Sequence, residues 1–288
     1  MKGASPNPTR VLGTVKRMML RRLESTLPLV TQTSWLPLKW GAVLHRTLAI
    51  PAAAHVRGKR IRLHVSSHVE LDRVRRYATK EPETLEWIDG FEPDTVFFDV
   101  GANIGVYSLY AAARHGPGIR VVAFEPESLN YAALNLNVAL NGFQHAIRGY
   151  CLALSDSPSL SVLSIDKLRA GGSNNQFGDR HSAPSHLQGS IGLSLDQLCS
   201  HWDLPRPHAL KIDVDGLELP ILRGAEGILS HPNFRTLLVE LLNDDPAQMD
   251  EVRALCDRAQ LELVSRSQRR NRDLNYVFRK RKPLATPA

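Results

Sequence analysis

Residues 95–265 alternate short β-branched apolar runs with longer segments of helical periodicity, and this alternation is the strongest constraint on the fold. Such a pattern predicts βαβ units on an open, mostly parallel sheet. The predicted strands are 61–67, 95–100, 119–125, 146–154, 160–165, 208–214, 236–242, 261–266 and 274–279, and the predicted helices are 81–90, 104–115, 127–140, 195–202, 217–229 and 246–260. An open α/β sheet binds its ligand beyond the carboxyl ends of its strands, so we expect the functional residues just after each strand.

A glycine turn follows the first strand of this series, in FFDVGANIGVYS (97–108). Gly101 lets the backbone turn close to a ligand, Asn103 lies within the turn, and Gly105 allows close packing of the helix that follows. Twenty residues later, Glu125 ends the second strand, where a carboxylate can accept both hydroxyls of an adenosine ribose. These residues predict a nucleoside cofactor at the sheet edge; the alternative is a plain glycine turn with a surface glutamate.

The residues of the turn also discriminate between cofactors. The loop lacks the G-x-G-x-x-G spacing of an NAD-type fingerprint, and the chain lacks a P-loop signature. Asp99, two residues before Gly101, suits a cationic ligand and fits poorly beside a pyrophosphate. S-adenosylmethionine has a sulfonium, an ammonium group and no phosphate, so the loop favours it.

A second acidic cluster occurs in KIDVDGLEL (211–219), where a predicted strand enters a helix. Asp213, Asp215 and Glu218 repel one another there unless a cation, a proton or solvent offsets their charge. They are candidates for a general base or for the oxygen ligands of a divalent metal, although we assign no metal site. For Asp215 and Glu218 the alternative is capping of the helix N-terminus. Lys211 is expected to pair with an acid in the sheet layer or to contact substrate.

The segments DVGANIG (99–105), AFEPES (123–128) and KIDVDGLELPILRGAE (211–226) resemble the FkbM methyltransferase family, a Rossmann-like branch of the S-adenosylmethionine enzymes. The resemblance spans roughly 80–280, with one departure: Asp215 stands where the family usually has glutamate. It implies a class I methyltransferase fold, which is a mostly parallel seven-stranded sheet with helices on both faces. It also implies that Asp156, after the third strand, contacts the adenine end of the cofactor; the alternative is a simple turn aspartate.

The resemblance further implies O-methylation of a hydroxyl on a glycan, sugar or polyketide-type small molecule. Asp213 or Glu218 would then orient or deprotonate this hydroxyl, with Asp215 as a third candidate. Two other functions remain open: a nucleotide-binding oxidoreductase of Rossmann type, and a non-catalytic protein that binds anionic surfaces through its basic ends. The polar tract 169–190 is too long for an ordinary connection and is expected to be a lid or binding loop.

Charge is distributed unevenly along the chain. Residues 1–60 hold 11 Lys or Arg and one acid, whereas residues 61–265 hold 17 basic and 27 acidic residues. We expect a basic helical N-terminal extension at 1–60, a methyltransferase domain at 61–282 and a disordered tail at 283–288. The extension either packs on the domain or docks on an anionic membrane or glycolipid surface.

Other protein classes conflict with the composition. The three cysteines are far apart and form no C-x-x-C motif, which argues against a disulfide framework or a zinc site. No apolar run reaches the ~18 residues of a membrane span. The four tryptophans do not alternate with basic residues as in a nucleic-acid platform. The sequence therefore predicts a cytoplasmic enzyme, peripheral to the inner membrane face if the extension docks there, with a small-molecule or glycan partner.

Overall fold

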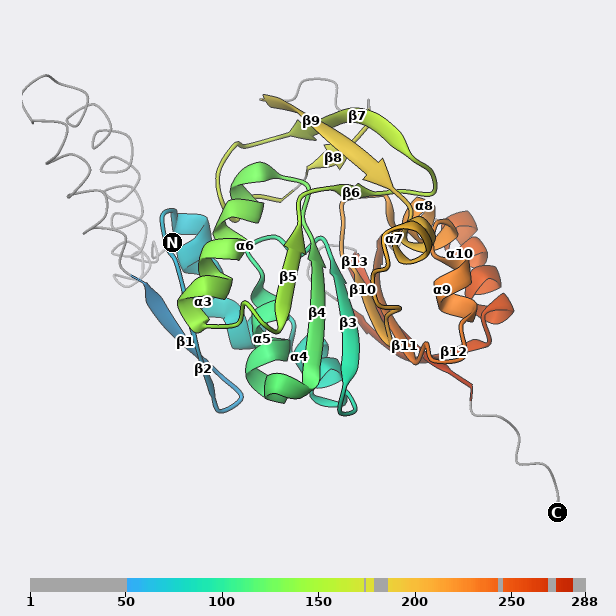
Figure 1. The fold of residues 1–288 in the computed structure, drawn as a ribbon, viewed down its shortest axis with the longest axis horizontal. Coiled ribbons are helices and arrows are strands. Elements are labelled where there is room, and N and C mark those ends of the chain that lie inside the picture. Colours follow the sequence, from blue (N-terminus) through green and yellow to red (C-terminus); the bar gives the residue numbers. More distant parts are fainter. Residues whose placement is uncertain (1–50, 174, 179–185, 243–245, 269–272, 282–288) are drawn as a thin grey trace, which may run out of the picture. The chain divides into compact units, whose positions relative to one another are not determined.

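The computed structural model describes residues 51–173, 175–178, 186–242, 246–268 and 273–281. A seven-stranded sheet lies at the centre of this part of the chain (Figure 1), in the order β12-β13-β11-β10-β3-β4-β5. Its strands are β3 (Thr95–Val100), β4 (Ile119–Phe124), β5 (Ile147–Tyr150), β10 (Ala209–Ile212), β11 (Thr236–Leu242), β12 (Leu261–Gln268) and β13 (Asp273–Lys280). Only β13 runs antiparallel to its neighbours, so the predicted mostly parallel seven-stranded sheet is confirmed.

Helices cover both faces of the sheet, because alternate residues of each strand point to opposite sides. Phe98 of β3 belongs to one core cluster, with residues of α7, α8, α9 and α10, whereas its neighbour Phe97 belongs to a second cluster, with residues of α4, α5 and α6. The helices are α4 (Pro82–Asp89), α5 (Val106–His115), α6 (Ser128–Asn141), α7 (Leu195–His201), α8 (Glu218–Arg223), α9 (Glu226–Ser230) and α10 (Pro246–Arg258). A short 3-10 turn, η1 (Gly116–Gly118), links α5 to β4.

The single helix predicted at 217–229 is instead two short helices, α8 and α9, which meet at Gly224. A Cβ on Gly224 would lie only 2.3 Å from the carbonyl oxygen of Ser155, so the backbone there packs against the loop that contains Ser155. This contact places the break between the two helices.

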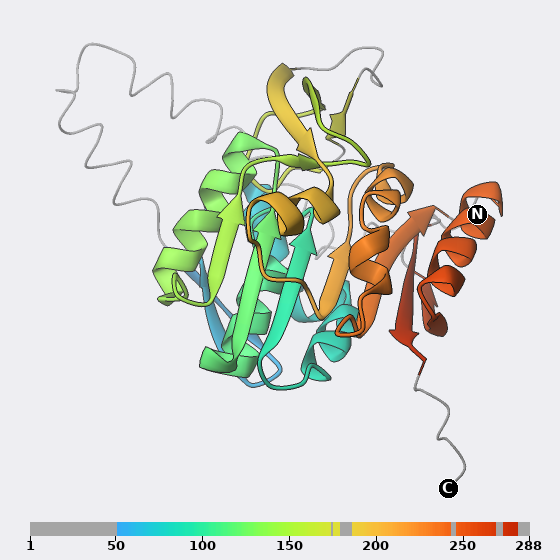
Figure 2. The same cartoon turned by 45° about the vertical axis from the view of Figure 1, so that its right-hand side comes forward.

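A second, four-stranded sheet lies beyond the carboxyl ends of the central strands, as Figures 1 and 2 both show. It consists of β6 (Ala153–Leu154), β7 (Ser159–Ile165), β8 (Gln176–Phe177) and β9 (His186–Leu193). The strand predicted at 146–154 is divided, since β5 joins the central sheet and β6 joins this one. β9 begins within the polar tract that was expected to be a loop.

The described chain begins with a hairpin, β1 (Ala52–Val56) and β2 (Lys59–Leu63), whose inward side chains lie in the core cluster of α5 and α6. The predicted domain boundary between residues 60 and 61 falls inside this hairpin. Residues 1–50 of the predicted extension and the predicted tail at 283–288 lie outside the described residues. No helix in the described part of the chain is long and apolar enough to cross a membrane.

Helix α3 (His68–Lys80) follows the hairpin and was not predicted. Its start is fixed by a reciprocal capping box: the Ser67 hydroxyl accepts from the Glu70 amide at 3.1 Å, and the Glu70 carboxylate accepts from the Ser67 amide at 2.9 Å. This Ser-x-x-Glu spacing is a recognised sequence signal for a helix N-terminus. Helix α3 brings basic side chains to the candidate active site.

Candidate active site

A cavity lies at the carboxyl ends of β3, β4 and β10, where the sheet places its expected ligand site. Its empty volume, which includes space open to solvent, is about 1010 Å³. The lining includes the glycine turn, Glu125, the segment 213–215, residues 152–154, part of the polar tract and two basic side chains of α3. The polar tract, which was expected to be a lid or binding loop, contributes Gly172, Ser173, Asn175 and Phe177 to the lining.

The glycine turn lies directly against the end of β10. Gly101 has φ of +77°, and a Cβ there would lie 2.0 Å from the carbonyl oxygen of Asp213. Only glycine combines this left-handed backbone with so close an approach. Gly105 begins α5 with φ of +87°, and its open side faces Leu134 of α6 rather than a strand. Gly101 lines the cavity, whereas Gly105 lies outside the lining.

Glu125 lies just after β4, with 5% of its surface exposed, and its carboxyl group borders the cavity. Its Oε2 accepts from the backbone amide of Asn103 at 2.7 Å, and its Oε1 accepts from the amide of Glu127 at 3.0 Å. Burial nevertheless raises the pKa of Glu125 to about 7, although these hydrogen bonds oppose the rise. The carboxyl is therefore held at the cavity wall in a fixed orientation.

Asp99 lies behind the cavity rather than in its lining. It is fully buried, and its Oδ2 accepts from the Ser108 hydroxyl at 2.6 Å. Its Oδ1 has no hydrogen-bond partner among the described residues. Burial raises the pKa of Asp99, while the charge of Lys211 acts in the opposite direction. Asp99 therefore lies beneath the glycine turn, outside the wall of the cavity.

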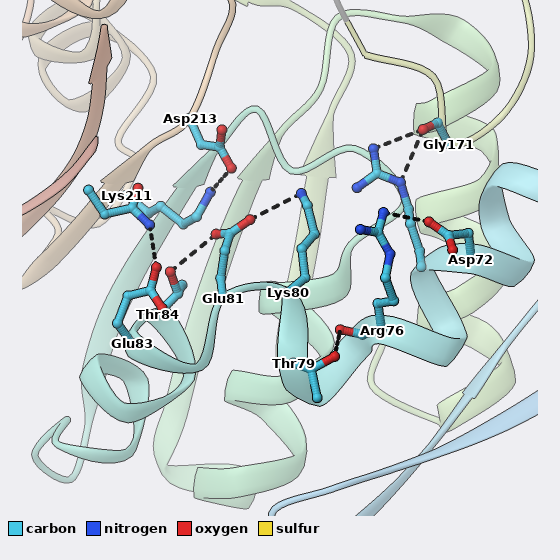
Figure 3. Close-up of polar contacts among 12 residues, drawn as sticks. Asp72, Arg76, Thr79, Lys80, Glu81, Glu83, Thr84, Gly171, Lys211 and Asp213 are labelled. Atoms are coloured by element: carbon cyan, nitrogen blue, oxygen red, sulfur yellow. Dashed lines mark hydrogen bonds and ion pairs between the residues drawn. The ribbon is translucent and has the colours of Figure 1, made fainter. Parts of the chain in front are cut away.

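Lys211 and Asp213 form an ion pair at the end of β10, with 2.7 Å between Nζ and Oδ2 (Figure 3). This confirms the ion-pair alternative for Lys211, which is 1% exposed. Its ammonium also lies 4.8 Å from the ring centroid of Tyr107, a cation–π distance. Burial opposes the charge of Lys211, but Asp213, Asp99 and Glu81 outweigh it and raise the Lys211 pKa. Lys211 thus neutralises a buried acidic cluster and holds the Asp213 carboxylate, which borders the cavity.

The two other acids of this segment differ in position. Asp215 lines the cavity, and its Oδ2 accepts from the Asn175 amide at 3.1 Å. Helix α8 begins after Leu217 with no side-chain cap, so the capping interpretation is wrong for Asp215. The reason is that Gly216, at φ of +90°, turns the chain between Asp215 and the helix.

Glu218 is the first residue of α8 and is 4% exposed. Its Oε1 accepts from the Gly216 amide at 3.1 Å, within the turn that leads into the helix. Burial raises the pKa of Glu218 to about 7, against the effect of these backbone hydrogen bonds. Its side chain lies outside the cavity lining.

Asp156 is also away from the cavity. It is exposed in the loop after β6, and its Oδ1 accepts from the Ser157 hydroxyl at 2.9 Å. Leu152, Ala153 and Leu154, a few residues earlier, line the cavity instead. The structure therefore offers an apolar wall near the place where the resemblance implied an acid.

Sequence reasoning missed the contribution of α3, which contacts the segment 170–172, here called the strap. Arg73 and Lys80 of α3 line the cavity. The strap joins α3 to the glycine turn, because the Gly171 carbonyl accepts from Arg73 and the Gly172 carbonyl accepts from Asn103 Nδ2 at 2.6 Å. The capping box of α3 would have revealed the helix, but not its position over the cavity.

The lining fits a cofactor that carries a positive charge and a nucleoside. Three acids line the cavity, a fourth lies buried behind it with an oxygen that lacks a partner in the described chain, and Gly101 of the glycine turn forms part of the cavity wall. Within the described residues, no group of three or more His, Cys, Asp or Glu side chains is placed to hold a metal ion.

Comparisons with known proteins agree with this geometry. The family model described as Methyltransferase FkbM domain matches residues 99–264. The hexuronic acid methyltransferase AglP of Haloferax volcanii is 28% identical over 261 residues, covering 86% of this chain and 94% of that protein. The 31-O-demethyl-FK506 methyltransferase FkbM of Streptomyces tacrolimicus is 46% identical over 192 residues, covering 57% of this chain and 71% of that protein.

A solved structure of the methyltransferase FkbM from Methylobacillus flagellatus aligns with a TM-score of 0.48 at 15% identity, covering 75% of this chain and 56% of that one. The family match itself includes the glycine turn, Glu125 and the acidic end of β10, and it covers more than half of the chain. The methyltransferase function is confirmed, and the oxidoreductase and surface-binding alternatives are not supported. The chain belongs to the FkbM family of S-adenosylmethionine-dependent methyltransferases.

Proposed function

We propose that this enzyme methylates a hydroxyl oxygen on a sugar, glycan or polyketide-type small molecule. The names of two relatives support the acceptor class, since one is a hexuronic acid methyltransferase and the other a 31-O-demethyl-FK506 methyltransferase. The observation that carries the proposal is the cavity itself, because Glu125 and Asp213 border one space at the carboxyl ends of β4 and β10, the strands on either side of β3.

We assign the ribose of the cofactor to Glu125. The edge of the cofactor that approaches the protein backbone is assigned to Gly101 and Asn103. The Glu125 carboxyl already accepts two backbone amides, which fix its plane, and a carboxylate retains further lone pairs for ribose hydroxyls. When bound, the cofactor supplies an electrophilic methyl group on a sulfonium. Asp99, below the turn, adds negative potential rather than direct contact.

Asp213 is the proposed base that orients or deprotonates the acceptor hydroxyl. It borders the cavity, and Lys211 holds one of its oxygens at 2.7 Å. Glu218, with its pKa near 7, would suit proton transfer but does not line the cavity. Asp215 holds the Asn175 segment at the cavity wall. Correct alignment of donor and acceptor can contribute about 7–11 kcal/mol of barrier reduction.

The proposed catalytic domain begins at the hairpin β1–β2, whose side chains share the domain core, and extends to about residue 282. For the basic segment before it we retain the proposal of docking on an anionic surface. Sedimentation with vesicles that contain an anionic lipid tests it: deletion of residues 1–50 should abolish the binding of the full chain, and unchanged binding would contradict it.

Calorimetric titration with S-adenosylhomocysteine tests the site assignment. Wild-type protein should bind it, Glu125→Ala should lose at least about tenfold in affinity, and Asp213→Asn should bind it normally. Turnover with a hydroxylated acceptor should be lost in Asp213→Asn. Normal turnover in Asp213→Asn would exclude its role as base, and equal affinity in Glu125→Ala would exclude the ribose assignment.

A further inference from the structure

We propose that Arg73 of α3 binds the α-carboxylate at the amino-acid end of the methyl donor. This inference rests on the cofactor position proposed above. It extends the site to a helix that lies outside the matched family region, which begins at residue 99. It also assigns a ligand to a residue that no sequence motif identified.

The charge distribution of the cavity requires a cation for this carboxylate. Among the described residues, the acids of the lining are Glu125, Asp213 and Asp215, and the only cationic side chains are Arg73 and Lys80. A carboxylate that faced the acids alone would be repelled, and a partly desolvated anion without a partner is costly. The carboxylate must therefore be directed to α3.

Of the two cations, Arg73 is the one with capacity to spare. The Lys80 ammonium already pairs with the Glu81 carboxylate at 3.0 Å (Figure 3). The Arg73 guanidinium uses Nε and Nη2, at 3.0 and 2.8 Å, on the single carbonyl of Gly171. Its Nη1 takes no part in these two bonds to Gly171. A guanidinium held along one edge is ready to bind a carboxylate with the other.

The position of Arg73 also matches the place where the cofactor's amino-acid end would be. Burial lowers the pKa of Arg73, while the nearby Asp213, Tyr107, Glu81 and Glu125 act in the opposite direction. Arg73 lines the same cavity as Glu125, the proposed ribose site, and Asp213, the proposed methyl-transfer end. The amino-acid portion of the cofactor branches from the sulfonium, to which the ribose and the methyl group are also attached.

The strap keeps Arg73 in this position. Gly171 has φ of +83°, and a Cβ there would lie 3.2–3.3 Å from atoms of Val69 and Glu70 at the start of α3. The Ser67 hydroxyl donates to the Ala170 carbonyl at 3.1 Å, and the Gly171 amide donates to Asn130 Oδ1 at 2.8 Å. The carbonyl that receives Arg73 is therefore fixed by α3 and α6 before any ligand binds.

The test compares two ligands that differ only in the carboxylate: S-adenosylmethionine and decarboxylated S-adenosylmethionine. Each is titrated calorimetrically into full-length wild type, Arg73→Gln and Arg73→Lys. Wild type should prefer the carboxylated ligand by about tenfold to a hundredfold. Arg73→Gln should lose this preference by weakening the carboxylated ligand alone, and Arg73→Lys should retain part of it.

Arg76→Gln is the matched control, because Arg76 lies on the same helix, is about half exposed and pairs with Asp72 outside the cavity lining. It should bind both ligands as wild type does. Absence of any preference in wild type would overturn the proposal even if the Arg73 variants fail to fold. Equal weakening of both ligands in Arg73→Gln, or a changed KM for acceptor alone, would also overturn it. Failure of wild type to bind either ligand would instead refute the cofactor site as a whole.

Discussion

Replacement of Gly101 by alanine tests whether the close approach of the glycine turn to β10 is essential. The new Cβ would lie 2.0 Å from the Asp213 carbonyl oxygen, at a φ of +77°. The left-handed backbone costs an L-residue about 1–2 kcal/mol, and relief of an overpacked contact costs about 1–3 kcal/mol more. The expected destabilisation is therefore about 2–5 kcal/mol, a large share of the ~5–15 kcal/mol stability of a typical domain.

Gly142→Ala is the matched control, because Gly142 also has positive φ, +72°, but a Cβ there has no atom within 4 Å among its described neighbours. Gly142→Ala should lose only the stability that the left-handed backbone conformation costs an L-residue. Unfolding in urea measures both variants, and calorimetry with S-adenosylhomocysteine measures the site. Gly101→Ala should be the less stable variant and should bind the ligand more weakly. If the two variants lose equal stability, the steric argument is wrong.

Three further predictions follow from the buried charges. Burial raises the pKa of Glu125 to about 7, and the ribose hydroxyls require the ionised form of this carboxyl. The affinity for S-adenosylhomocysteine should therefore fall by up to about tenfold per pH unit below pH 7 and be constant above pH 7. Glu125→Gln should abolish this pH dependence in calorimetry. Lys211→Met leaves buried acids without their cation and should cost about 3–5 kcal/mol in urea unfolding; a loss below about 1 kcal/mol would contradict the assigned role. Glu218 has a folded pKa of about 7, above its unfolded value near 4.5, so the folded state binds more protons between these values. Stability should therefore fall as pH rises through 4.5–7, by up to about 3 kcal/mol, and Glu218→Gln should flatten this slope in thermal unfolding.

The central sheet and the core of the site were predictable because they depend on local patterns. Period-two and helical spacing identified the strands and helices around β3 and β4, and strand ends identified Gly101, Glu125 and Asp213. These features follow from short-range rules, since a ligand site at the carboxyl edge is a property of every open parallel sheet.

The features that could not be predicted from the sequence depend on tertiary contacts, which local sequence patterns do not encode. Arg73 lies nearly thirty residues before the glycine turn, and it lines the cavity through the tertiary packing of α3 and its contact with the strap at Gly171. Strand β9 is rich in polar residues and pairs along β7, so its own sequence does not resemble a buried strand. Helix capping was a plausible alternative for Asp215 because the turn at Gly216, which separates Asp215 from α8, is not visible in the spacing.

A crystal structure of the full chain with S-adenosylhomocysteine tests the central claim most directly. The account predicts ribose hydroxyls within about 2.6–3.2 Å of the Glu125 carboxylate, with the sulfur on the side of Asp213. A ligand bound elsewhere, or a ribose without contact to Glu125, would contradict it.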